Sequence, residues 1–244
     1  MQMKNSLFLF GGLLLALPLV GCGSNNSGPK ESGPKESGPK EWETTYSGQE
    51  ALAQFNNLLD ALAQKGSFIV TNRVDYDETS YDILTENITG TSDYMETLLH
   101  NEEEGTQIYK TWAYVEGGEY YLASLEHGEE VGTLYKDESQ YRSGYRAYLM
   151  VLEVQNWYKN FEFIEKGKTE KIDGETVTSV SFTFKEMSGE DYTLVEGQTD
   201  GTLILNCESV SHYNGRSHNP SKFEFDYDSP VEFELPDLTG WNVD

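Results

Sequence analysis

A regular alternation of apolar and polar side chains in the second half of the chain limits the fold most strongly. Phe223, Phe225 and Tyr227 occupy every second position, with Glu224 and Asp226 between them. The same period of two recurs in two further runs, Val180, Phe182 and Phe184, and Leu203, Leu205 and Cys207. Successive side chains of a strand point to opposite faces, so each run predicts a strand with one face toward a core and the other toward water.

Strand-like runs extend through most of the chain after residue 67. We predict strands at 68–76, 80–88, 93–100, 106–115, 119–126, 130–135, 161–165, 176–187, 192–195, 201–212 and 222–227. Turn-forming pairs such as Gly117-Gly118 and Asn214-Gly215 separate them. This spacing is typical of an antiparallel meander.

Two segments have the helical period instead. In residues 48–65 the apolar positions that share one helical face are Leu52, Phe55, Leu58, Leu59 and Leu62. Ser47 and Glu50 predict a capping box at the start of this helix, and Gly66 predicts a left-handed stop. In residues 139–159 the aligned positions are Tyr141, Tyr145, Tyr148, Leu149 and Leu152. We therefore expect a mainly β, α+β domain with an N-terminal helix and a mid-chain helix.

The first 22 residues have the pattern of a targeting segment. Lys4 supplies a positive start, residues 6–20 carry no charge, and Leu19-Val20-Gly21-Cys22 follows. The apolar stretch is shorter than the roughly 20 residues of a membrane-spanning helix, which favours a signal peptide.

The Leu19-Val20-Gly21-Cys22 tetrapeptide resembles the lipobox of bacterial lipoproteins. The resemblance implies cleavage before Cys22 and a diacylglyceryl group on the Cys22 thiol, which would hold the protein at the extracytoplasmic face of the cell membrane. Two acyl chains suffice for stable anchoring, whereas one chain binds only marginally. The alternative is an ordinary secretory signal with an incidental cysteine.

Three copies of Ser-Gly-Pro-Lys-Glu fill residues 27–41. Each repeat is neutral and has nothing apolar to bury, and its proline opposes helix formation. The repeats predict an extended tether; a proline-rich docking ligand is the weaker alternative. We divide the chain into a signal peptide (1–21), the lipidated cysteine and tether (22–46) and a single β domain (47–244).

The charge of the chain excludes one class of partner. It has 17 basic and 42 acidic residues, a formal net charge of −25. Such a polyanion repels nucleic-acid phosphates, so nucleic acid is not an expected partner. Anionic lipid headgroups repel it too, so an acyl anchor, rather than the protein surface, would hold it at the membrane.

The order of the elements resembles the LolA/LppX/RseB-like lipoproteins. An N-terminal helix, a long meander, a mid-chain helix, further strands and a closing Val231-Glu232-Phe233-Glu234-Leu235-Pro236 carry the resemblance, over roughly residues 47–238. It implies a curved antiparallel half-barrel whose helices cover a concave apolar face. Members of this group carry or sense lipids or acylated proteins, or have no known ligand.

Motifs for catalysis and metal binding are weak. There is no Gly-x-Ser-x-Gly run, and Gly167-Lys168-Thr169 lacks the first glycine of a phosphate-binding loop. Cys207 is expected in the core. We therefore predict no enzyme activity, catalytic residue or cofactor.

Histidines and acids give no complete metal site. His212 and His218 flank a hairpin tip but supply only two ligands, so we predict no metal. Asp75, Asp77 and Glu86 match three positions of a calcium loop, but the required glycine is missing, which favours an ordinary hairpin turn. A chain with 42 acidic residues will contain some carboxylate pair at the spacing used for glycoside hydrolysis, so such a pair is no evidence for that activity.

Several strands are apolar on both faces, which either a sheet covered on both sides or a cavity on one side would explain. Aromatic residues that could stack on sugars, but more often fill a core, are Trp112, Tyr114, Tyr120, Tyr121 and Trp157. If a lipid-like pocket exists, the candidate ligand-binding residues are Phe182, Phe184, Leu203, Leu205, Phe223, Phe225 and Tyr227.

The leading hypothesis is a non-enzymatic binding or carrier module for a lipid-like or other apolar ligand. One alternative is a surface module for protein–protein interaction or signalling, with an envelope protein as partner. A second alternative is a carbohydrate-binding or carbohydrate-active protein.

Overall fold

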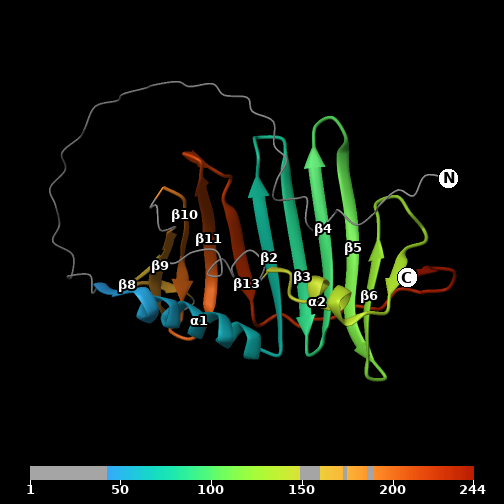
Figure 1. The fold of residues 1–244 in the computed structure, drawn as a ribbon, viewed down its shortest axis with the longest axis horizontal. Helices are drawn as coiled ribbons and strands as arrows, with labels where there is room; N and C mark the ends of the chain where they lie inside the picture. Colours follow the sequence, from blue (N-terminus) through green and yellow to red (C-terminus); the bar gives the residue numbers. More distant parts are fainter. Residues whose placement is uncertain (1–42, 149–159, 173–174, 186–189) are drawn as a thin grey trace. The chain divides into compact units, whose positions relative to one another are not determined.

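One large β-sheet dominates the computed structural model, which describes residues 43–148, 160–172, 175–185 and 190–244 (Figure 1). The elements before residue 149 are β1 (Glu43–Ser47), α1 (Gly48–Gln64), β2 (Ser67–Asp75), β3 (Tyr81–Thr89), β4 (Ser92–Asn101), β5 (Gly105–Glu116), β6 (Glu119–Leu125), β7 (Thr133–Tyr135) and α2 (Glu138–Gly144). Those after it are β8 (Asn160–Ile172), β9 (Glu175–Lys185), β10 (Tyr192–Thr199), β11 (Ile204–Tyr213), β12 (Arg216–Ser217), β13 (Ser221–Asp226) and β14 (Asn242–Val243). The expected signal peptide, Cys22 and the repeats lie outside the described residues.

The sheet joins two meanders. Its strand order is β1-β8-β9-β10-β11-β13-β2-β3-β4-β5-β6-β7-β14, with β12 beside β11. The late strand β13 pairs with the early strand β2, so that Phe223 lies opposite Asn72. All described pairings are antiparallel except the β7–β14 pair. The prediction of a mainly β fold on an antiparallel sheet is confirmed.

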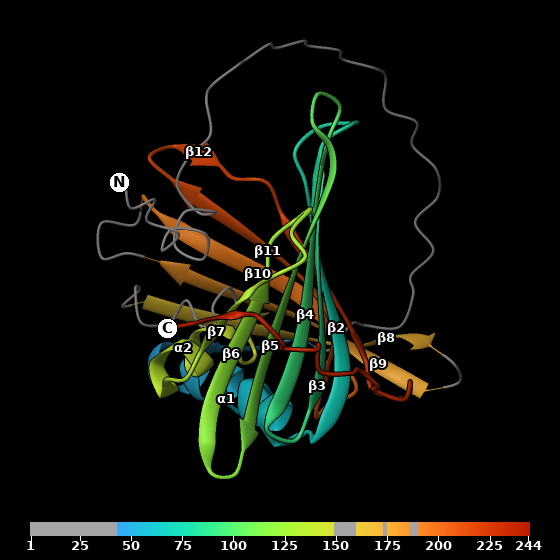
Figure 2. The same cartoon turned by 90° about the vertical axis from the view of Figure 1, so that its right-hand side faces the viewer.

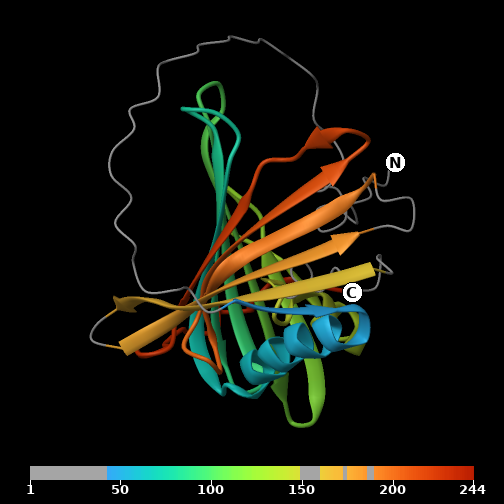
Figure 3. The same ribbon diagram turned by 90° about the vertical axis from the view of Figure 1, so that its left-hand side faces the viewer.

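The sheet is strongly curved and does not close. Figures 2 and 3 show strands β8–β11 fanning away from the direction of β2–β5, as accumulated strand twist requires. The two ends of the strand order, β1 and β14, are not paired with each other. Helix α1 runs below β8–β11 in Figure 3 and contacts β8.

The sheet begins earlier in the sequence than expected. Residues 43–46, expected to belong to the tether, are part of β1 and pair with β8. Tyr46 stacks on Phe163 with ring centroids 5.6 Å apart. This segment is too short for its alternation to distinguish a strand from a linker. Only the pairing with β8 identifies it as a strand.

Neither end of helix α1 has the capping structure expected from the sequence. Ser47 is the N-cap, but its side chain makes no capping hydrogen bond, so the predicted capping box is absent. Gly66 does not have the positive φ of a left-handed stop. The helix has already ended at Lys65, which is extended with φ −67° and ψ 120°. Instead the Arg146 guanidinium donates to the Leu62 and Ala63 carbonyls at 3.1 and 2.9 Å.

The mid-chain helix is shorter than predicted. Asp137 caps α2 by accepting from the Ser139 and Gln140 amides at 2.9 and 3.1 Å, and the helix ends at Gly144. Arg146 then has φ 57°, a left-handed conformation that breaks the helical path. The prediction of a continuous helix over 139–159 is therefore wrong for residues 145–147. Residues 149–159 lie outside the described part of the chain.

Three apolar clusters are formed by the described residues of the domain. The largest lies between α1 and the sheet and includes Phe55, Leu62, Phe68, Phe182 and Phe223. A second, with Ala113, Leu122 and Tyr141, lies under α2. The third covers the opposite face of the same strands, where Phe233, Leu238 and Trp241 of the C-terminal segment pack on Trp112 and Tyr114. The strands with two apolar faces are thus covered on both sides.

Candidate binding groove

The face expected to line a pocket is a filled core where α1 crosses it. The Phe55 ring lies 4.5 Å from the Phe182 ring and 5.0 Å from the Phe184 ring, both centroid to centroid. Phe223 and Phe225 are buried in the same cluster, and Tyr227 is partly buried with its hydroxyl donating to the Ile204 carbonyl. These five predicted residues therefore lie together on one face, but the helix occupies the space above them.

The two predicted leucines differ from the rest because a bulge changes the alternation. The β10–β11 register shifts between Gln198 and Thr199, which leaves Leu205 as the extra residue. Ile204 is buried in the core in place of Leu205, and Leu203 packs at the edge of the cluster. The expectation that Leu203, Leu205 and Cys207 form one continuous face is wrong for this reason.

A groove remains beside the core, between α1 and the strands β8–β10. It has a volume of about 300 Å³. Leu58 of α1, Phe163 of β8 and Val180 of β9 form its apolar floor, and all three are buried. This volume is at the lower end of the range of small-molecule sites, roughly 300–1,000 Å³.

Neutral polar groups line the rest of the groove. Gln54 and Asn57 come from α1, Thr178 from β9, and Thr202 from the loop between β10 and β11. Glu165 is the charged side chain of the lining, and no basic residue lines it within the described part of the chain. The groove therefore combines an apolar floor with amide and hydroxyl donors and acceptors.

The loop on one side of the groove is held by its own hydrogen bonds. Thr199 Oγ1 donates to the Leu203 carbonyl at 2.6 Å and accepts from the Gly201 amide at 3.0 Å. The Asp200 carboxylate accepts from the Thr202 and Leu203 amides at 2.7 and 2.8 Å. Gly201 has φ 99°, which favours glycine. The loop thus presents Thr202 to the groove in a defined conformation.

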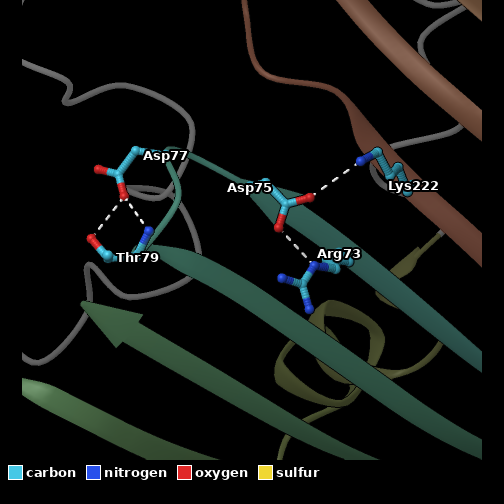
Figure 4. A network of polar contacts seen from close by, with 5 residues as sticks. All are labelled: Arg73, Asp75, Asp77, Thr79 and Lys222. Carbon is cyan, nitrogen blue, oxygen red and sulfur yellow. Dashed lines mark hydrogen bonds and ion pairs between the residues drawn. The ribbon is translucent and has the colours of Figure 1, made fainter. Parts of the chain in front are cut away.

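The residues of the calcium-loop register do not converge. Figure 4 shows Asp75 between Arg73 and Lys222, at 2.7 and 3.2 Å, and Asp77 accepting from the Thr79 amide at 2.8 Å. The Arg73 and Lys222 partners lower the pKa of Asp75, while the Thr79 donors lower that of Asp77. Glu86 is buried elsewhere in the sheet. The hairpin-turn interpretation is confirmed for residues 77–79.

A second cavity, of about 400 Å³, lies at the tips of the β2–β3 and β4–β5 hairpins. It is lined by Asp77, Asn101 and three consecutive glutamates, 102–104, among others. Within the described residues, no group of three or more His, Cys, Asp or Glu side chains has the arrangement of a metal site. His212, one of the hairpin histidines, stacks on Tyr192 and contacts Ser217 Oγ through Nδ1 at 2.9 Å.

The aromatic residues considered for sugar stacking are mostly part of the core. Trp112 and Tyr114 are buried beneath the C-terminal segment, and Tyr121 stacks on Tyr114 at 5.0 Å. Tyr120 packs against Tyr141 of α2 at 5.1 Å. The core interpretation is confirmed for Trp112 and Tyr114, whereas Tyr120 and Tyr121 are partly buried and pack against core clusters. Trp157 lies outside the described residues.

Cys207 is also a core residue, as expected. It is buried in the cluster under α1, and desolvation raises the pKa of its thiol to about 12. The thiolate, which is the reactive form, is therefore strongly disfavoured at neutral pH.

The groove is not apparent from the sequence. Its polar lining comes from helix α1, from strands β8–β10 and from the four-residue loop 200–203, and none of these carries a motif. Comparisons with protein-family models, with curated proteins and with solved structures found no match for this chain. Among the described residues, no helix has the length and apolar character needed to cross a bilayer.

Proposed function

We propose that the chain is a lipid-anchored extracytoplasmic lipoprotein whose domain is a non-enzymatic binding or carrier module. The groove beside α1 would take an amphipathic ligand with one short apolar chain. The observation that carries this proposal is the apolar floor of Leu58, Phe163 and Val180 beside neutral polar side chains. A helix that packs on one face of a curved sheet also fits the LolA-like half-barrel that the order of elements resembles.

The size and charge of the groove define the ligand class further. A volume of about 300 Å³ suits a single chain better than a diacyl lipid. The net charge of −25 and the nearby Glu165 disfavour an anionic headgroup. We therefore expect zwitterionic or neutral headgroups.

Filling the groove should abolish binding. Ala61 lines the groove, whereas Ala63 is exposed two residues further along the same helix. In fluorescence titrations of the full chain carrying Cys22→Ser, Ala61→Phe should weaken binding of a short-chain lysophosphatidylcholine at least tenfold, about 1.4 kcal/mol. Ala63→Phe is the matched control and should bind as the parent does.

The same titration tests the headgroup preference. An anionic lysophosphatidylglycerol of equal chain length should bind more weakly, and the difference should shrink in 0.5 M salt because screening shortens the range of the repulsion. Equal effects of Ala61→Phe and Ala63→Phe, or no saturable binding of either lipid, would contradict the groove as the site.

The anchor is tested separately. In a bacterial host, Cys22→Ser should move the protein from the membrane fraction to the soluble extracytoplasmic fraction, because the thiol that accepts the diacylglyceryl group is gone. Mass spectrometry of the parent protein should show an acylated N-terminal cysteine. A parent protein that is membrane-bound without acylation, or a variant that stays in the membrane, would reject the anchor.

A further inference from the structure

Two carboxyl groups lie buried side by side in the middle of the sheet. Glu86 of β3 is 0% exposed and Asp93 of β4 is 1% exposed. The register places Glu86 opposite Met95 and Ile88 opposite Asp93, so the two acids are diagonal neighbours on the core-facing side. None of the ion pairs among the described residues includes either acid.

The carboxyl pair contacts the segment that follows α2. The Arg146 amide donates to Asp93 Oδ2 at 2.6 Å. The Glu86 carboxyl lies close to Asp93 and to the amides of Ala147 and Tyr148. Both Glu86 oxygens and Asp93 Oδ1 are nevertheless buried without a well-formed hydrogen bond in the described structure. An ionised pair in this position would be strongly penalised, whereas a protonated carboxyl could donate to its neighbour.

The same segment holds the C-terminal end of α1. The Arg146 guanidinium donates to the carbonyls of Leu62, Ala63 and Lys65, at 3.1, 2.9 and 3.3 Å. Its Nε donates to the Tyr145 hydroxyl at 3.0 Å. Since the guanidinium is turned to α1 and the backbone amide to Asp93, residues 145–148 connect the buried acids to the helix that covers the core.

We propose that Glu86 and Asp93 form a proton-dependent latch, which holds residues 145–148 and the end of α1 on the sheet while it is protonated and loosens when it is ionised. This inference is independent of the proposed ligand. The groups that face the pair are Arg146 and Tyr148 from the segment and Tyr141 from α2. The Tyr145 hydroxyl, which accepts from Arg146, donates to the Gly90 carbonyl.

The electrostatics of the pair support this direction of response. Burial is the main cause that raises the pKa of Glu86 well above its usual range, and the charge of Asp93 adds to it. Burial also raises the pKa of Asp93 to about 7, against the lowering effect of the Arg146 amide. Burial raises the pKa of Tyr141 to about 12, so its hydroxyl stays neutral over this range. Groups with raised pKa values stabilise the fold at low pH, and this contribution is lost as the pH rises through neutrality.

The test compares the parent chain with the double variant Glu86→Gln, Asp93→Asn. Raising the pH from 5 to 8.5 should lower the Tm of the parent by roughly 5–10 °C. After correction for intrinsic exchange rates, it should also reduce the hydrogen-exchange protection of the amides of residues 62–65 and 146–148. The double variant should lose most of this pH dependence. Glu96→Gln, on the opposite face of β4, is the matched control and should respond as the parent does.

A double variant whose Tm falls with pH as steeply as that of the parent would overturn the latch. If the double variant does not fold, carbon-detected NMR of the parent decides the matter. At least one of the two carboxyl signals should titrate above pH 6 in that experiment. Titration of both below pH 5 would overturn the proposal.

Discussion

Phe55→Ala should lower the free energy of unfolding by about 3–5 kcal/mol, the range for removing a large buried aromatic side chain. Phe55 is 0% exposed and meets Phe182 and Phe184 edge to face, at 4.5 and 5.0 Å. The substitution removes both ring contacts and leaves a cavity at the centre of the largest cluster. Urea denaturation followed by circular dichroism measures the change.

Two further variants test whether the lost free energy of unfolding comes from the buried volume of the Phe55 ring. Phe55→Leu keeps most of the buried volume and should cost clearly less than Phe55→Ala. Asp60→Ala changes an exposed position of the same helix and should stay within about 0.5 kcal/mol of the parent. A loss below about 1 kcal/mol for Phe55→Ala would show that α1 does not cover the sheet in the way described.

Trp112→Ala should be comparably destabilising, at about 3–5 kcal/mol, but through the other face of the sheet. Trp112 is 6% exposed, packs on Trp241 at 6.2 Å, and donates from Nε1 to the Glu234 carbonyl at 3.1 Å. Its loss removes both the apolar contact and the hydrogen bond that hold the C-terminal segment. We therefore expect faster proteolytic cleavage within residues 229–241 as well as lower stability.

The aromatic contact and the hydrogen bond can be separated. Trp112→Phe keeps a ring in place but removes the indole donor, and should cost less than Trp112→Ala while still increasing cleavage. Cleavage of residues 229–241 that is equally slow in the parent and in Trp112→Ala would mean that this tryptophan does not hold the segment.

The sequence predicts most of the strands because alternation is a local signal. Phe223 and Phe225 mark the inward face of β13 by their spacing alone, without reference to the neighbouring strands. Phe55 and Leu62 likewise lie in the cluster under α1, on the apolar face of the 48–65 pattern. In each case the spacing of side chains along one element decides which residues are buried.

Features that depend on distant partners were not predictable in this way. The pairing of β13 with β2 joins residues about 150 positions apart and has no local signature. Leu205 follows the alternation in sequence, but a bulge fixed by the neighbouring strand replaces it with Ile204 in the core. Arg146 appears in the sequence as one more helix residue, although the structure gives it a left-handed backbone and contacts with α1.

The buried acids left a weak signal that alternation alone could not interpret. Glu86 lies two residues before Ile88, on the inward face of β3, where an apolar side chain is the usual choice. In a chain with 42 acidic residues, one more acid in a strand is unremarkable. Glu86 stands out from the other acids only in the folded structure, where the β3–β4 register brings Asp93 beside it and residues 145–148 contact the pair.

The measurement that tests the central proposal most directly is a two-dimensional NMR titration of the full chain carrying Cys22→Ser with a short-chain lysophosphatidylcholine. We predict saturable shifts of backbone amide signals in residues 54–61, 178–180 and 199–202, which surround the groove. Signals of the aromatic cluster around Trp112 should stay unchanged. Shifts confined to that cluster, or no shifts at saturating lipid, would contradict the groove as a binding site.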